Sequence, residues 1–169
     1  MGILSGKRGL IMGVANERSA AWGIAAAAAS HGAELAFTYQ IEGFRKRLEP
    51  LAASIGSSLL IECDVAEDSA IAKSFAELST SWDSLDFVVH AIGFSDKSEL
   101  KGAYYNTSRQ NFADTMLVSA FSFTEVAAAA RKMMPNGGSL LTMSYLGGVR
   151  TSPNYNVMGV AKAALEAST

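Results

Sequence analysis

Five short apolar runs, separated by longer helical stretches, most constrain how this chain can fold. Runs of this kind predict strands that are buried on both faces, as in a parallel sheet covered by helices. The expected strands lie at residues 9–12, 34–39, 58–63, 85–90 and 139–143. The expected helices lie at residues 19–30, 41–55, 69–79 and 111–133, followed by a last helix with Ser152 as N-cap and Pro153 in its first position.

This alternation predicts an α/β fold. Because crossovers between parallel strands are right-handed, the natural architecture is a Rossmann-type, doubly wound parallel sheet. The 169 residues suit one domain. Because Rossmann-type sheets commonly bind dinucleotides, we expect residues 1–169 to form a single dinucleotide-binding domain. The last helical stretch has no terminating Gly or Pro, so we expect a sheet truncated after about five strands and a domain that is incomplete at its C-terminus.

Composition argues against several classes of protein. The net charge of −2 gives no electrostatic footprint for nucleic acid or an anionic membrane. The first residues lack the apolar stretch of a secretory signal. The single Cys63 cannot form an internal disulfide, so we expect a buried thiol and a cytoplasmic location. His31 and His90 have no ligand partners at useful spacing, so no metal site is expected.

The first strand-to-helix turn lacks a G-x-G-x-x-G pattern but still suits a pyrophosphate. Gly13 permits a sharp turn, and Ser19 with the free N–H groups behind it would face the phosphates at the positive end of the helix dipole. Gly23 is expected to let this helix lie close to the sheet. An ordinary turn capped by Ser19 explains the same pattern equally well.

The next three strand ends should share the carboxyl edge of the sheet, where α/β proteins bind ligands. Gln40 has a neutral amide that can bond a ribose hydroxyl, which favours NADH, whereas the cations at 45–47 keep NADP open. Asp64 can accept a hydrogen bond from adenine or cap a turn. Gly93 would let a ligand approach the backbone closely. The convergence of these positions at one edge supports a cofactor site.

A tyrosine and a lysine near the end of the chain indicate catalysis. Tyr155 and Lys162 are two helical turns apart, or about 10 Å along one helix face. A nearby ammonium lowers the pKa of a phenol and stabilises an oxyanion. An isolated Tyr-x6-Lys pair is more often a half-exposed tyrosine and a solvated lysine, so the spacing alone does not decide.

Together with their neighbours, these residues resemble the bacterial enoyl-[acyl-carrier-protein] reductase (NADH) family of the short-chain dehydrogenase/reductase superfamily. The superfamily commonly has Tyr-x3-Lys, but position 159 is Gly here, and the six-residue gap is typical of the enoyl reductases. The segments that carry the resemblance are residues 4–8, 32–40, 63–68, 90–94, 144–147 and 155–162.

The resemblance implies NADH-dependent reduction of trans-2-enoyl-acyl-carrier-protein thioesters in fatty-acid biosynthesis. Tyr155 would bond the thioester oxygen, Tyr145 would line the acyl side, and Lys162 would hold the nicotinamide ribose. The substrate pocket would also include Phe94, Ser95 and Met158. The implied NADH contacts, besides Lys162, are Gly13, Ser19, Ala20, Gln40, Asp64, Val65, Ile92 and Gly93.

The resemblance also implies partners and leaves alternatives. Members of the family continue beyond residue 169 and form homotetramers through the helices expected at 111–133 and from Pro153 onward. The alternatives are another short-chain ketoreductase, an inactive truncated nucleotide-binding remnant, and a subunit that acts only by associating with other chains. The six-residue gap and Tyr145 argue against the ketoreductase.

Overall fold

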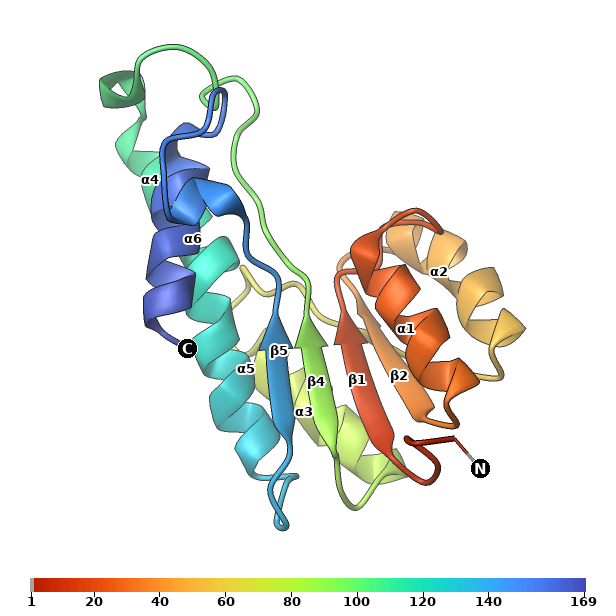
Figure 1. Ribbon diagram of the computed structural model, residues 1–169. Helices are drawn as coiled ribbons and strands as arrows, with labels where there is room; N and C mark the ends of the chain where they lie inside the picture. Colours follow the sequence, from red (N-terminus) through yellow and green to blue (C-terminus); the bar gives the residue numbers. More distant parts are fainter. Residues whose placement is uncertain (1) are drawn as a thin grey trace. The chain divides into compact units, whose positions relative to one another are not determined.

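The computed structural model describes residues 2–169, and within them five strands form one parallel sheet in the order β3-β2-β1-β4-β5 (Figure 1). The predicted α/β, Rossmann-type sheet is confirmed. The strands are β1 (Arg8–Met12), β2 (Glu34–Tyr39), β3 (Leu59–Glu62), β4 (Phe87–His90) and β5 (Ser139–Thr142). The α-helices are α1 (Ala20–Ser30), α2 (Glu42–Ser54), α3 (Ala70–Ser81), α4 (Arg109–Met116), α5 (Ser122–Arg131) and α6 (Asn156–Ala167).

The chain divides into two compact units. The first, here called the sheet unit, consists of residues up to Ala91 together with Ala127–Thr142 and contains all five strands. The second, here called the helical unit, consists of Ile92–Val126 and Met143–Thr169. A single dinucleotide-binding domain over residues 1–169 stays a prediction.

In the sheet unit, β1 lies at the centre, paired with β2 on one side and β4 on the other. Helices α1 and α2 lie on one face of the sheet and α3 on the opposite face (Figure 1). Ile11, Phe37 and Val89 are almost fully buried in the apolar core. The chain order reverses direction between β1 and β4, and α/β proteins bind ligands at the carboxyl ends of strands at such a point.

Helix α1 contacts the sheet through alanines. Ala21, Ala25 and Ala28 are buried in the sheet unit's core, where their small side chains bring the helix close to β1 and β2. Gly23 does not serve this purpose, because a Cβ built there meets no atom within 4 Å. The prediction for Gly23 is therefore wrong, since the alanines and not the glycine face the strands.

The helical unit contains the segments that follow β4 and β5. Its long helical segment consists of α4, a π turn η2 (Leu117–Phe121) and the start of α5. It also contains two short 3-10 turns, η1 (Tyr104–Asn106) and η3 (Leu146–Gly148), and α6, which contacts α4, η2 and η3. The long helix expected at residues 111–133 is present as a continuous helical run over 109–131, and the π turn in its middle was not predicted.

The last helix begins later than expected. Asn154 has a φ of 58°, in the left-handed region, which a helix cannot pass through. Tyr155 then occupies the N-cap position, and α6 starts at Asn156. The prediction of a helix that starts with Ser152 and Pro153 is wrong, because Asn154 breaks the chain direction between Pro153 and Tyr155.

Candidate active site

The turn after β1 has the features predicted for a phosphate-binding turn. Gly13 has a φ of 93°, a left-handed conformation that favours glycine. Ser19 is the N-cap of α1: its Oγ accepts from the Trp22 N–H at 3.4 Å and donates to the Asn16 carbonyl at 2.7 Å. The exposed Ala20 opens the helix, where first-turn N–H groups have no intrahelical acceptor. This end of α1 can bind an anion.

The ends of β2 and β3 bring two predicted cofactor residues into contact. Gln40 Nε2 donates to Asp64 Oδ2 at 2.8 Å, and the other carboxylate oxygen accepts from the Ala66 N–H at 3.0 Å. Asp64 therefore does cap a turn, as the alternative interpretation predicted, and it also orients Gln40. Val65 is buried, with 6% of its surface exposed, and its contact with NADH stays a prediction. The Gln40–Asp64 bond was not predicted, because the two residues are 24 positions apart and meet only in the folded sheet.

Lys162 is buried in the helical unit with 7% of its surface exposed. Its Nζ donates to the Met143 carbonyl at 2.7 Å, and burial lowers the pKa of the ammonium. A Cβ at Gly93 would lie 3.7 Å from this Nζ. Lys162 therefore lies between the segments that follow β4 and β5, and the solvated-lysine interpretation is wrong.

Two tyrosines face each other beside α6. The ring centroids of Tyr145 and Tyr155 are 4.8 Å apart, and the rings are tilted by 57°. Burial, followed by the proximity of Tyr145, raises the pKa of the Tyr155 phenol above its ordinary value. The prediction that Lys162 lowers this pKa is wrong. A phenol with a raised pKa stays protonated at neutral pH and can donate a hydrogen bond.

Two glycines explain how η3 fits against α6. A Cβ at Gly147 would overlap Tyr155 Cδ1, and a Cβ at Gly159 would lie 2.7 Å from the Gly147 carbonyl oxygen. Any larger residue at 159 would therefore push the turn away from the helix. The close approach of η3 to α6 therefore requires glycine at position 159.

The predicted substrate residues occupy different environments. Phe94 is 55% exposed, and Met158 is partly buried on α6. Ser95 is buried, and its hydroxyl donates to Asn111 Oδ1 at 3.2 Å and accepts from Thr115 Oγ1 at 3.0 Å. The Ser95 hydroxyl therefore holds its own loop, and its contribution to a substrate pocket stays a prediction.

Sequence reasoning missed several polar residues that support this region. Ser119 is fully buried and bonds the backbone of Phe94, and Glu166 on α6 accepts from the Ser144 hydroxyl. A signal for the first was present, because Asn111, Thr115 and Ser119 recur every four residues, which places polar groups on one helix face.

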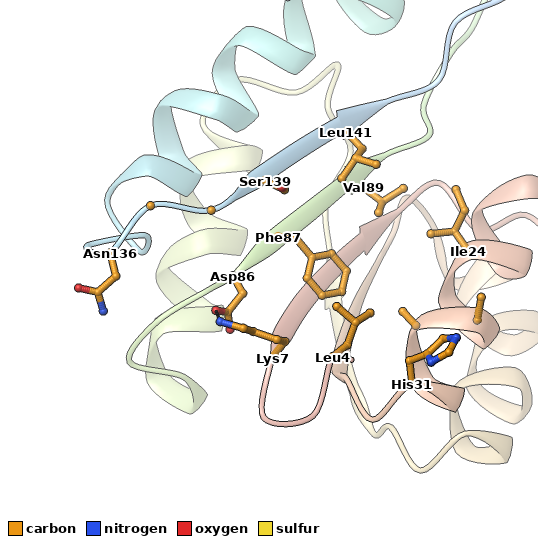
Figure 2. A pocket seen from close by; sticks show the side chains of 14 residues that line it. Leu4, Lys7, Ile24, His31, Asp86, Phe87, Val89, Asn136, Ser139 and Leu141 are labelled. Atoms are coloured by element: carbon orange, nitrogen blue, oxygen red, sulfur yellow. Dashed lines mark hydrogen bonds and ion pairs between the residues drawn. The ribbon is translucent and has the colours of Figure 1, made fainter. Parts of the chain in front are cut away.

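A separate pocket of about 760 Å³ lies in the sheet unit (Figure 2). Apolar side chains such as Leu4, Ile24 and Leu141 line it, and the Lys7–Asp86 ion pair, at 2.8 Å, lies among its polar residues (Figure 2). None of the predicted cofactor or substrate residues lines it. Much of its lining comes from the amino ends of strands, whereas the predicted cofactor residues follow their carboxyl ends, so this pocket is not the candidate active site.

The described part of the chain has neither a metal-binding cluster nor a membrane-spanning helix. Residues 2–169 contain no group of three or more His, Cys, Asp or Glu side chains that could hold a metal ion. No helix among these residues has the length and apolar character needed to cross a bilayer. Cys63 is buried with a free thiol, as expected, and burial raises its pKa.

Comparisons with known proteins agree with this geometry. The model of the family described as Enoyl-(Acyl carrier protein) reductase matches residues 13–169. Enoyl-[acyl-carrier-protein] reductase [NADH] 2 of Rhizobium meliloti is 58% identical over 167 residues, which are 99% of this chain and 62% of that protein. The FabI of Salmonella typhimurium is 51% identical over 99% of this chain and 64% of its own length.

Solved structures give the same result. The crystal structure of FabI from Candidatus Liberibacter asiaticus superposes with a TM-score of 0.98 at 56% identity, over 100% of this chain and 66% of that one. The Anaplasma phagocytophilum enzyme, solved in complex with NAD, has a TM-score of 0.96 at 53% identity, over 99% of this chain and 64% of that one.

The fold and the Tyr-x6-Lys pair thus define a member of the short-chain dehydrogenase/reductase superfamily. Within it, the chain belongs to the enoyl-[acyl-carrier-protein] reductase family. The resemblance inferred from the sequence is confirmed. The chain spans 62% of the length of the Rhizobium meliloti relative.

Proposed function

We propose that a form of this protein as long as its relatives, here called the long form, uses NADH to reduce trans-2-enoyl thioesters of acyl carrier protein in fatty-acid biosynthesis. One observation carries the proposal: Tyr155, a phenol that stays protonated, is the N-cap of α6, and Lys162, a buried ammonium, lies about two turns further along the same helix. The second support is the 58% identity to a reductase named for this reaction.

The residues present suit NADH. The anion-binding start of α1 suits the pyrophosphate, and the Gln40–Asp64 pair offers amide and carboxylate groups for the adenosine. The Lys162 ammonium has three N–H donors. Within residues 2–169, it donates one hydrogen bond, to the Met143 carbonyl. Its remaining donors suit the hydroxyls of the nicotinamide ribose.

The chain's own residues would then stabilise charge on the substrate. When bound, NADH would supply a hydride to the β-carbon of the enoyl thioester. Tyr155 would donate a hydrogen bond to the thioester oxygen, where the negative charge of the resulting enolate develops, and Lys162 would add positive potential. A proton from solvent would then reach the α-carbon and complete the reduction. Tyr145, packed against Tyr155, would limit the phenol's rotation and line the acyl side. Phe94 and Met158 would provide apolar surface for the acyl chain.

Steady-state kinetics on the long form test the proposal directly. We expect NADH absorbance to fall when a crotonyl thioester of acyl carrier protein or coenzyme A is added. A β-ketoacyl thioester serves as the matched control substrate, because it separates an enoyl reductase from a ketoreductase. Reduction of the keto substrate alone, or of neither substrate, would contradict the proposal.

Cofactor preference follows from the end of β2. The Gln40 side chain is neutral and its amide is already bonded to Asp64. It therefore provides no positive charge to bind the 2′-phosphate of NADPH. We therefore expect the long form to bind NADH more tightly than NADPH by about tenfold or more, the effect of one unpaired charge. Titration by nicotinamide fluorescence checks this. Equal or tighter binding of NADPH would instead assign a phosphate contact to Arg45 or its neighbours.

Assembly and location are part of the same proposal. Three large apolar side chains on α4 and η2 are 36–52% exposed: Phe112, Leu117 and Phe121. These large apolar side chains support pairing between subunits, and we propose a homotetramer. The free Cys63 thiol is consistent with the cytoplasm as the proposed location. Light scattering that showed a monomer of the long form at micromolar concentration would contradict the assembly.

A further inference from the structure

The loop that follows β4 is held by polar side chains from the helix beside it. This loop, residues 91–98, contains no helix or strand. Asn111 Oδ1 accepts from the Asp96 N–H at 2.8 Å and from the Ser95 hydroxyl at 3.2 Å. The Ser119 hydroxyl bonds the residue before Ser95: it accepts from the Phe94 N–H at 2.9 Å and donates to the Phe94 carbonyl at 3.0 Å. One hydroxyl therefore satisfies both backbone groups of Phe94.

Ser119 makes these bonds from an unusual place. It is fully buried in the π turn η2, between α4 and α5. A π turn inserts an extra residue into a helix at some cost and is often retained at functional sites. Neither Gly nor Pro lies within Leu117–Phe121 to cause it. The two hydrogen bonds between Ser119 and the Phe94 backbone compensate for the cost of the π turn.

The same hydroxyl lies close to the buried lysine of the site. A Cβ at Gly93 would be 3.7 Å from Ser119 Oγ and 3.7 Å from Lys162 Nζ. Gly93 is therefore close to both groups, and Phe94, which Ser119 holds, is the next residue. A shift of this backbone would change the wall beside Lys162.

We propose that Ser119 is a positioning residue for the reductase site: from the π turn it fixes the backbone of Gly93 and Phe94 beside Lys162. The role rests on the proposed function, because it is defined by the placement of the reacting groups. Ser119 acts through the loop, so it need not touch the substrate. Its effect should appear in turnover and in the mobility of Phe94, and to a smaller extent in global stability.

The experiment compares Ser119→Ala with Ser74→Ala in the long form. Both changes remove a buried serine hydroxyl, but Ser74 lies in α3 of the sheet unit and bonds the Ile71 carbonyl of its own helix. Alanine is small and favours helix, so both variants should fold. For Ser119→Ala we expect kcat with crotonyl thioester to fall by about tenfold or more, because small displacements of reacting groups are costly. Ser74→Ala should keep the wild-type kcat.

Hydrogen exchange at the Phe94 amide tests the contact independently of activity. In Ser119→Ala the Phe94 amide should exchange at least about tenfold faster, because its acceptor is lost. In Ser74→Ala the exchange rate of this amide should be unchanged. Unchanged exchange in Ser119→Ala would overturn the contact, and so would an equal acceleration in both variants. Faster exchange with an unchanged kcat in an active enzyme would overturn the positioning role alone. If wild type exchanges slowly at Phe94 but reduces no enoyl thioester, the proposed function fails instead.

Discussion

The sheet unit and the helical unit are stabilised by different kinds of contact. Of the nine buried polar or charged residues among those described, six lie in the helical unit and three in the sheet unit, although the sheet unit is larger. The sheet unit buries mainly apolar side chains such as Ile11 and Phe37. In the helical unit, Asn111, Ser119 and Lys162 hold loop backbone by hydrogen bonds.

This difference shows that the helical unit, more than the sheet unit, buries polar groups that must be desolvated and hydrogen-bonded. Apolar burial is non-directional and stabilises a fold whatever the reaction. Buried polar groups must each find a partner, and when they do they fix one local arrangement. Hydrogen bonds of this kind suit a region in which Tyr155 and Lys162 must keep their places. We therefore expect core substitutions to alter the stability of the sheet unit and polar substitutions in the helical unit to alter turnover.

The largest expected effect on stability comes from the core of the sheet unit. Ile11→Ala should lower the free energy of unfolding by about 2–5 kcal/mol, because Ile11 is fully buried and its truncation leaves a cavity. Ile3→Ala is the matched control: Ile3 is 83% exposed, and its loss should cost less than about 0.5 kcal/mol. Urea denaturation of the long form measures both. Equal losses would contradict the packing described for β1.

A smaller effect distinguishes two helical glycines. In Gly159→Ala the new Cβ would lie 2.7 Å from the Gly147 carbonyl, so the turn must shift, at a cost of about 1–3 kcal/mol. In Gly23→Ala the new Cβ meets nothing within 4 Å, and the exchange should raise stability by about 0.5–1 kcal/mol. Thermal unfolding of both variants checks the opposite signs. A stabilising Gly159→Ala would disprove the close contact between η3 and α6.

The smallest effect concerns a partly exposed ion pair of the sheet unit. A hydrogen bond from Lys7, aided by the Arg8 N–H, lowers the pKa of Asp86 below its ordinary value. Asp86 therefore stabilises the fold above the ordinary carboxyl pKa, and this contribution is lost as pH falls through the lowered pKa. Solvent screening limits it to less than about 1 kcal/mol. Asp86→Asn should lower stability at pH 7, and the difference from wild type should shrink in acid titrations. A difference that grows in acid would reverse the assignment.

Much of the fold could be predicted because it depends on patterns that are local in sequence. The five strands and the helices between them follow from apolar runs and turn residues, and Ser19 was correctly placed at the start of α1. The late start of α6 could not be predicted, since it depends on the left-handed conformation of Asn154. The π turn has no Gly or Pro to announce it, and its partner Phe94 is 25 residues away in sequence.

Spacing and the family resemblance single out Tyr155 and Lys162 as candidate site residues, and their roles stay a prediction. The contacts that support them could not be predicted from the sequence. The burial of Lys162, the raised pKa of Tyr155 and the Gln40–Asp64 bond all depend on tertiary packing. Periodicity and spacing describe neighbours along the chain, whereas desolvation depends on all the residues that pack around a group.

The central claim is that Tyr155 acts on the substrate oxygen while Lys162 holds the cofactor, and two substitutions in the long form separate these roles. Tyr155→Phe should lower kcat with crotonyl thioester by about a hundredfold, because the phenolic donor is lost. Its NADH dissociation constant should remain within about twofold of wild type, since the phenol contributes to turnover alone. Lys162→Ala should weaken NADH binding and turnover together. Nicotinamide fluorescence and steady-state rates measure both quantities. A Lys162→Ala enzyme with wild-type NADH affinity, or a Tyr155→Phe enzyme with wild-type kcat, would contradict the account.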